Sequence, residues 1–413
     1  MKFLLCAFFA IAGCCATLNA QQPAIPNSVA PISAPAADQA EAVQGANSFA
    51  IDLYGQLRSQ PGNLFFSPES ISTAFAMAYA GARGETAAEM ARVLHYTLPP
   101  ERLHPAMGAR LAAMNAPHAG YELHVADALW AEREAKILAS YLKLTQEDYA
   151  AGLRRAEFRN APEPARIEIN RWVEQQTNDR IQNLLPPGTI TTNTRLVLTN
   201  AIYFKGRWSA PFDKAQTKEG AFHLSATQSV QAPLMHRAGN YGYYEGERFQ
   251  ALELPYAGDE ITMVVLLPKD STGLAALEGE LTANAIDQWI GQLTPTKKVM
   301  VTLPRFTMTD RFELHHALAA MGMGRVFAGE ADFSGIDGKR DFSISDAVHK
   351  AFVEVNEEGT EAAAATGLVF RATAMHFEPP PVIFRADHPF LFLIRETKSG
   401  GILFLGRLND PTK

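Results

Sequence analysis

The spacing of hydrophobic residues changes repeatedly along the chain, and each change marks a different expected element. From Ala46 onward, Phe49, Leu53 and Leu57 recur every four residues, which is typical of the buried face of an α-helix. Residues 195–208 instead form an almost continuous apolar run, as expected for a strand covered on both faces. The pattern therefore predicts a fold of mixed helices and strands.

The same two patterns predict further elements. Helices are expected at residues 68–82, 137–149, 167–177 and 313–321, with another beginning near residue 84. Strands are expected at residues 63–66, 126–130, 250–254, 261–267, 298–303 and 402–408. No internal repeat and no second boundary interrupts the series. We therefore predict a single α+β domain over residues 46–413.

The residues before this domain have a different character. Lys2 precedes an apolar run over residues 3–12, which is typical of a signal peptide and too short for a membrane-spanning helix. Cleavage after Ala20 would give a secreted, extracellular or periplasmic protein. Alternatively, residues 11–14 resemble a bacterial lipobox, which would make Cys14 the lipid-bearing N-terminus of an outer-membrane lipoprotein. Residues 21–45, rich in Ala, Pro and Gln, are predicted to form a flexible linker.

Composition and charge agree with one large packed domain. Hydrophobic residues make up 47% of the chain and charged residues 20%. The net charge is −7, and Lys and Arg form no basic stripe, so we expect no nucleic-acid partner. All three cysteines, Cys6, Cys14 and Cys15, precede the expected domain. Its folded part therefore has no disulfide, thiol nucleophile or cysteine-ligated metal.

Common enzyme motifs are absent. The chain has no HExxH zinc motif, GxSxG nucleophile elbow or phosphate-binding Walker A loop. His315 and His316 are neighbours on an expected helix, where adjacent side chains point about 100° apart, so they are poor joint metal ligands. A triad assembled from distant residues stays open as an alternative. The sequence nevertheless favours a non-enzyme with no catalytic residues, metal or cofactor.

Residues 357–375 are unusually rich in small side chains. If they form a strand, one face carries only uncharged residues, namely Thr360, Ala362, Ala364, Thr366, Leu368 and Phe370. Glu361 falls on the opposite face. The uncharged face can therefore be buried in a sheet without stranding a charge. An alanine-rich helix is the alternative, which composition alone supports equally.

The sequence on either side of this stretch favours the strand. Residues 344–366 resemble the reactive-loop hinge of the serpin family, and residues 384–395 resemble the family signature after that loop. The resemblance covers about residues 46–411. It implies the serpin fold, with three β-sheets, about eight to nine helices and an exposed reactive-centre loop at about residues 357–384.

The resemblance also implies a function. Inhibitory serpins are suicide substrates of serine proteases: cleavage in the loop lets the hinge enter the main sheet and traps the acyl-enzyme. Here the hinge would comprise Glu357, Gly359, Thr360, Glu361, Ala362, Ala363, Ala364, Ala365 and Thr366. Its small residues favour insertion. The implied protein is a monomer without a cofactor. The alternative is a non-inhibitory serpin acting as a binding or chaperone module.

In the serpin family the cut usually falls fourteen residues after the hinge glycine, so the resemblance implies a scissile bond between Thr373 and Ala374. The loop is longer than is common in the family, so Arg371, Ala372, Met375 and His376 remain alternatives. Thr373 or Ala372 would suit an elastase-like or subtilisin-like enzyme, Arg371 a trypsin-like one, and Met375 a larger apolar pocket. A cysteine protease is a further alternative target.

Two structural sites follow from the same resemblance. Ser67, Ser70, Asn200 and His349 match a polar cluster beneath the opening of the main sheet. Trp208 matches a tryptophan at the point where the loop enters. Taken alone, His349 would be a hydrogen-bonded core histidine and Trp208 an ordinary core aromatic.

Overall fold

A computed structural model describes residues 33–150, 153–359 and 380–413. The expected signal peptide and Cys14 lie outside these residues. The chain divides into a unit over Met1–Pro31 and a unit over Ile32–Lys413, and only the second is described here.

The first sheet has five strands. Its order is β10 (Phe306–Glu313), β11 (Asp346–Val355), β4 (Leu196–Gly206), β2 (Tyr121–Glu132) and β3 (Leu153–Ala156). The central strands β11 and β4 are parallel, while β10 pairs antiparallel with β11 and β2 pairs antiparallel with β4. Strand β4 is the apolar run predicted from the sequence. Ten of its eleven residues are buried, because helices cover both faces of the sheet.

The second sheet has nine strands. In order, they are β1 (Leu64–Phe66), β14 (Ile402–Leu408), β13 (Phe390–Glu396), β8 (Ile261–Pro268), β7 (Phe249–Pro255), β6 (Ser229–Glu245), β9 (Thr294–Pro304) and β12 (Val382–Arg385), with β5 (Lys218–His223) paired to β6. Two hydrogen-bonded sheets are therefore found among the described residues, where three were expected. The long strand β6 pairs with β5, β9 and β7 in turn, which joins the expected second and third sheets.

The described residues include ten α-helices, against the eight to nine expected. They are α1 (Ala36–Leu57), α2 (Pro68–Tyr79), α3 (Gly84–Val93), α4 (Pro100–Met114), α5 (Ala139–Tyr149), α6 (Pro162–Gln176), α7 (Leu274–Gly279), α8 (Ala283–Gly291), α9 (Leu314–Ala320) and α10 (Ser334–Asp337). Short 3-10 turns occur at Lys214–Gln216 and Arg325–Phe327. The last helix, α10, has only four residues, which explains most of the difference.

The expected linker was wrong over its last ten residues. Helix α1 begins at Ala36, directly after Pro35, so residues 36–45 are helical. An ion pair of 2.6 Å between Asp38 and Arg102 holds the first turn against α4, and Ala42 is buried. Alanine and glutamine are common in linkers, but both are also good helix formers.

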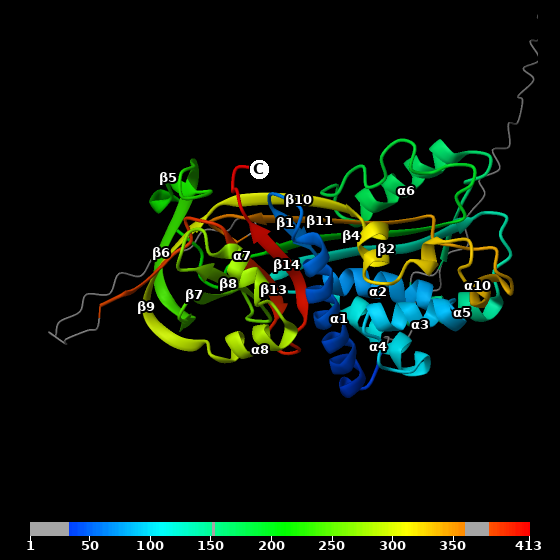
Figure 1. Cartoon of the computed structure of the whole chain (residues 1–413), viewed down its shortest axis with the longest axis horizontal. Coiled ribbons are helices and arrows are strands. Elements are labelled where there is room, and N and C mark those ends of the chain that lie inside the picture. The colour runs from blue at the N-terminus through cyan, green and yellow to red at the C-terminus, as the bar shows by residue number, and fades with distance from the viewer. Residues whose placement is uncertain (1–32, 151–152, 360–379) are drawn as a thin grey trace, which may run out of the picture. The chain divides into compact units, whose positions relative to one another are not determined.

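Helices cover both faces of the five-stranded sheet (Figure 1). Helix α2 contacts β2 and β4 from one side and is almost wholly buried. Helix α6 lies on the other side, where Trp172 makes an edge-on contact with Trp130 of β2 at 5.5 Å. The guanidinium of Arg154 lies 4.5 Å from the centre of the Trp172 ring. Aromatic and cation–π contacts thus hold α6 over β2 and β3.

Candidate functional site: the sheet opening and the hinge base

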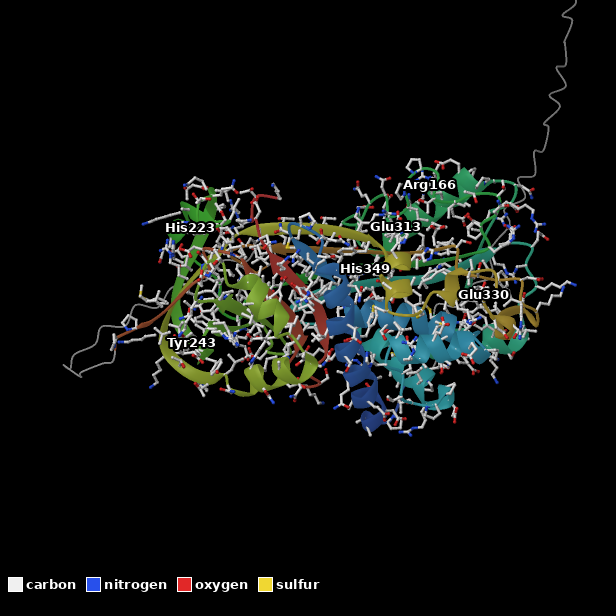
Figure 2. The ribbon with its side chains drawn as sticks, in the orientation of Figure 1. Arg166, His223, Tyr243, Glu313, Glu330 and His349 are labelled. Carbon is white, nitrogen blue, oxygen red and sulfur yellow. The ribbon has the colours of Figure 1, made fainter. Side chains whose placement is uncertain are left out.

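A buried polar cluster lies where β4 and β11 meet. Asn200 and His349 are direct partners in the parallel register of these strands. His349 Nε2 accepts a hydrogen bond of 3.1 Å from the backbone N–H of Ser67. Its Nδ1–H therefore donates to Asn200 Oδ1. Figure 2 labels His349 at this position in the sheet.

The other end of the Asn200 side chain extends the cluster across the sheet. Its Nδ2 donates to Ser70 Oγ at 2.5 Å and also to Asp127 Oδ1. Ser70 Oγ donates to the same carboxyl oxygen at 3.3 Å, and Ser70 N–H donates to Ser67 Oγ at 3.4 Å. The structure thus brings Ser67, Ser70, Asn200 and His349 together. Their hydrogen bonds join α2 to three neighbouring strands.

Burial controls the charge of His349. The side chain is fully buried, which lowers its pKa to about 3. The imidazole is therefore neutral at ordinary pH, as its acceptance of the Ser67 N–H requires. Protonation of Nε2 would make it a donor as well, so that its N–H would face the N–H of Ser67.

Asp127 is a member of the cluster that the sequence interpretation missed. It is 4% exposed, and burial raises the pKa of its carboxyl well above the usual range. One carboxyl oxygen has no hydrogen-bond partner. The only sequence signal is a single acidic residue between Ala126 and Ala128 in an apolar strand, and its importance depends on the register with Asn200.

The strands on either side of this cluster separate toward the hinge. The parallel pairs run from Asp346–Val197 to Phe352–Tyr203. Beyond them, β4 continues against β2 as far as Gly206, whereas β11 continues against β10 as far as Val355. The parallel ladder therefore stops before the ends of both strands, on the side where the chain leaves β11 for the hinge.

The first residues of the expected hinge are held at this end of the sheet. Glu357 is 3% exposed, and its carboxylate accepts a hydrogen bond of 2.7 Å from Thr217 Oγ1. Arg305 lies 3.7 Å from the same carboxylate. Glu358 forms an ion pair with Lys214. The base of the hinge is therefore fixed by ionic and hydrogen-bonded contacts.

Gly359 ends the described part of the hinge and cannot be replaced without strain. Its φ is +103°, in the region that favours glycine. A Cβ at this position would lie 2.3 Å from the Gly206 carbonyl oxygen and 2.4 Å from the Trp208 nitrogen. Only glycine lets the chain pass this close to the end of β4.

Trp208 packs beside the hinge and within the core. Its ring nitrogen donates to the Asn356 carbonyl at 2.9 Å, and its backbone N–H donates to the Glu358 carbonyl at 3.0 Å. The ring stacks on Tyr256 with centroids 4.5 Å apart. Trp208 is thus both a core aromatic and an anchor for the hinge base.

The rest of the expected loop lies outside the described residues. This applies to hinge residues Thr360, Glu361, Ala362, Ala363, Ala364, Ala365 and Thr366, and to scissile-bond candidates Arg371, Ala372, Thr373, Ala374, Met375 and His376. Their positions remain predictions from the sequence.

Other candidate sites in the described part of the chain carry no recognisable chemistry. No group of three or more His, Cys, Asp or Glu there can hold a metal ion, and none of its helices is long and apolar enough to cross a bilayer. The rings of His315 and His316 stack 5.3 Å apart instead of pointing apart as expected. They lie on α9, a helix of only seven residues.

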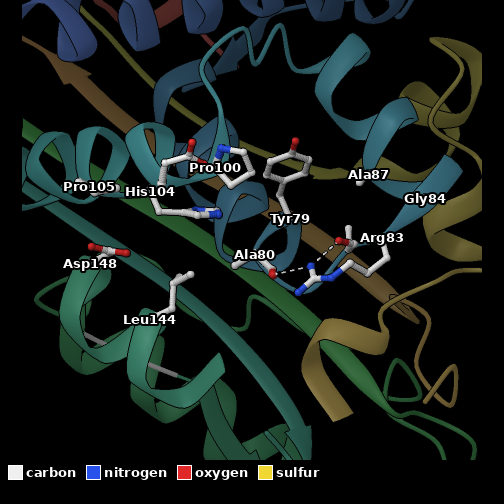
Figure 3. Close-up of a pocket in the computed structure, with 12 residues that line it drawn as sticks. Tyr79, Ala80, Arg83, Gly84, Ala87, Pro100, His104, Pro105, Leu144 and Asp148 are labelled. Atoms are coloured by element: carbon white, nitrogen blue, oxygen red, sulfur yellow. Dashed lines mark hydrogen bonds between the residues drawn. The ribbon is translucent and has the colours of Figure 1, made fainter. Parts of the chain in front are cut away.

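A cavity of about 560 Å³ lies among α2, α3, α4 and α5 (Figure 3). Two of its polar side chains are hydrogen-bonded: His104 to Tyr149 at 2.8 Å, and Arg83 to the carbonyls of Ala80 and Ala82. Burial lowers the pKa of His104 to about 4, so this side chain is neutral. The cavity is not lined by β4, β11 or the hinge base.

A model of the serpin (serine protease inhibitor) family matches residues 44–411. The chain belongs to the serpin family. It is 42% identical to human leukocyte elastase inhibitor over 383 residues, covering 90% of this chain and all of that one. It is 41% identical to a serpin-like protein of Thermococcus kodakarensis over 370 residues, covering 89% of this chain and 85% of the relative.

Solved serpin structures confirm the expected fold. Uncleaved ovalbumin matches with a TM-score of 0.82 and 32% identity, over 90% of this chain and all of that one. Human thyroxine-binding globulin, solved with its bound hormone, matches with a TM-score of 0.81 and 29% identity, over 91% of this serpin and all of that chain. The chain therefore belongs to a family of protease inhibitors and not of enzymes, and several of its relatives are named as inhibitors.

Proposed function

We propose that this serpin inhibits a serine protease as a suicide substrate, by inserting its cleaved hinge between β4 and β11. The observation that carries the proposal is the divergence of these two strands next to the hinge base, beyond the Phe352–Tyr203 pair. The hinge follows β11 and reverses direction at Gly359. A returning strand would run antiparallel to both parallel neighbours, which suits it to pair with each of them.

Insertion would release substantial free energy. A segment of about 12 residues would add on the order of 10 backbone hydrogen bonds, each worth about 0.5–1.5 kcal/mol. The gain is on the order of 10 kcal/mol, comparable to the whole stability of an ordinary domain. The uncharged face from Thr360 to Phe370 would enter the sheet without burying a charge.

Trapping follows from the chemistry of the target. The protease serine attacks the carbonyl carbon of the cut bond, the new amine departs, and an ester links protease to hinge. A loop of about 15 residues spans up to about 50 Å when extended. Insertion would drag the attached protease by a comparable distance. Because the oxyanion hole and triad tolerate little displacement, hydrolysis of the ester would stall.

The polar cluster would control the opening of the sheet. The hydrogen bond from His349 to Asn200 crosses from β11 to β4, so it has to break before a strand can enter between them. Asn200 would keep its contacts with Ser70 and Asp127 on the β2 side. The cluster would therefore close the sheet reversibly.

Elastase-like or subtilisin-like proteases are the proposed targets. The small residues Thr373 and Ala374 suit a small primary pocket, and similarity to leukocyte elastase inhibitors supports this class. A trypsin-like enzyme cutting at Arg371, an enzyme with a larger apolar pocket cutting at Met375, and a cysteine protease are the alternatives.

The proposed location rests on the N-terminal sequence. An apolar run after Lys2 supports export, with cleavage after Ala20 or, alternatively, lipid attachment at Cys14. Mass spectrometry of the protein purified from its own cells would distinguish these: a start at Gln21 supports secretion, and a lipid-bearing Cys14 supports membrane anchoring.

The decisive experiment mixes the purified serpin with elastase, subtilisin and trypsin in turn. We expect at least one of them to give a covalent adduct that survives denaturing electrophoresis, and mass spectrometry of the released C-terminal peptide identifies the cut bond. Clean cleavage by all three without an adduct would contradict the trapping mechanism. It would favour the non-inhibitory binding module, a role supported by the similarity to thyroxine-binding globulin.

A further inference from the structure

The two most exposed large apolar side chains in the described part of the chain lie next to each other. Ile383 on β12 is 63% exposed and Met300 on β9 is 49% exposed. They are direct partners in the parallel register, and Met300 is also the partner of Ala238 on β6. Paired residues of neighbouring strands point to the same face. Ile383, Met300 and Ala238 thus form an apolar row across three strands.

This row contributes little to the core. The alternate residues on the same strands, Phe384 and Val301, are 0% and 2% exposed and fill the inner face. Ile383 is on β12, the edge strand of the nine-stranded sheet, and its carbonyl accepts a hydrogen bond of 3.3 Å from Gln250. An exposed isoleucine and methionine aligned on one face indicate a contact surface.

Polar side chains border the apolar row. The next row of the same face comprises Arg385 and its partner Thr302, with His236 opposite Thr302 on β6. His236 is hydrogen-bonded to Thr302 at 3.0 Å. Burial, and then the charges of Arg385 and Lys218, lower the pKa of His236, which favours its neutral form. Arg385 forms an ion pair with Asp387. The surface therefore fits a partner that offers an apolar patch with polar groups beside it.

The short distance along the chain between the apolar row and the expected scissile bond indicates which partner would bind the row. Eight residues separate the expected scissile bond, Thr373–Ala374, from Val382 at the start of β12. Fully extended, they span at most about 28 Å. A protease domain of about 200 residues has a radius of gyration of about 16 Å. An enzyme bound at this bond therefore lies within reach of the row.

We propose that Ile383, Met300 and Ala238, bordered by Arg385 and His236, form a second docking surface for the target protease. The inference rests on the proposed inhibitory function and adds a site outside the loop that selects the enzyme. A second copy of the chain fits less well, because a net charge of −7 disfavours self-association.

The test compares the rate constant for adduct formation between wild type and the double variant Met300→Gln, Ile383→Thr. Both side chains are exposed, so folding should be retained, as the thermal midpoint would verify. Leu142→Gln, which replaces a 37% exposed leucine on α5, is the matched control. We expect the double variant to react about five- to tenfold more slowly with the target, and the control to react normally.

Three other results would overturn this inference. An unchanged rate with every protease that forms an adduct would show that the row is not used. A faster rate would mean that the row restrains the loop. A wild-type dimer in sedimentation that dissociates in the double variant, with the rate unchanged, would assign the row to self-association. Failure of wild type itself to form an adduct would instead contradict the inhibitory function.

Discussion

At the scale of single residues, the polar cluster contains two buried titratable groups whose contributions to stability change with pH in opposite directions. Burial lowers the pKa of His349 to about 3, so its neutral form stabilises the fold above the pKa of the unfolded chain, near 6.5. That contribution is lost as the pH falls toward 3. Burial raises the pKa of Asp127, so its contribution is largest at low pH and is lost as the pH rises through the folded-state pKa.

Replacing Asp127 by asparagine separates the two effects. The asparagine side chain would keep the shape of the carboxyl and one accepting oxygen for Asn200 and Ser70, but it could not ionise. We expect Asp127→Asn to raise the free energy of unfolding by about 1–3 kcal/mol at pH 8 and to change it little at pH 4. Thermal unfolding at both pH values measures this, with Asp341→Asn, at a 72% exposed side chain, as the control. A lower stability of Asp127→Asn at pH 8 would show that the carboxylate is needed.

The polar cluster also marks the limit of residue-level prediction. Ser67, Ser70, Asn200 and His349 were recognised only by resemblance to the family, because they are far apart in the sequence. Asp127 was missed, since its role depends on a register of β2 against β4 that no local pattern encodes. The role of Trp208 at the hinge was also predicted only by resemblance, since its place at the end of the apolar run over residues 195–208 indicates no more than a core aromatic.

At the scale of elements, strongly patterned segments could be predicted and weakly patterned ones could not. Strand β14 has the predicted bounds, 402–408, because five of its seven residues are large and apolar and all seven are buried. Strand β6 was not predicted over residues 229–245. Pro233, Gly239 and Gly242 are turn-forming residues, and only pairing with three other strands keeps that segment extended. Tertiary contacts there outweighed local preference.

The hinge permits an element-level test of strand insertion. Thr360 lies on the face expected to enter the sheet, and Glu361 on the opposite face. Burying an arginine without a partner costs several kcal/mol, so Thr360→Arg should slow insertion and let the ester hydrolyse. We expect the ratio of trapped to cleaved serpin to fall on the order of tenfold. Quantitative electrophoresis after reaction with the target measures it.

Glu361→Arg is the matched control for this variant. It introduces the same side chain one residue later, on the face that would stay outside the sheet. Its ratio of trapped to cleaved serpin should remain near that of wild type. Equal trapping by Thr360→Arg and wild type would show that the alternation of faces has been misassigned.

At the scale of the whole molecule, the proposed mechanism requires a native fold that is not at its lowest free energy. The five-stranded sheet is held closed by the seven parallel pairs between β4 and β11, by the polar cluster and by α6 packed above it. The hinge base is tied down by contacts of Glu357 and Glu358. Cleavage leaves these contacts in place but frees the chain beyond them. Whether insertion occurs then depends on two free energies. One is the cost of separating β4 from β11, and the other is the gain from hydrogen bonds on both sides of the inserted strand.

Cleavage of the loop without trapping therefore offers the most direct test of whether insertion is favourable. A protease that cuts the loop and dissociates should leave a two-chain serpin with an inserted sixth strand. A gain on the order of 10 kcal/mol in a domain of this size would raise the thermal midpoint by about 10–20 °C. Calorimetry of intact and cleaved protein measures the shift, and Thr360→Arg, cleaved in the same way, should show a much smaller one. If the cleaved wild type melts at the temperature of the intact protein, then its loop stays outside the sheet and the binding-module alternative takes precedence.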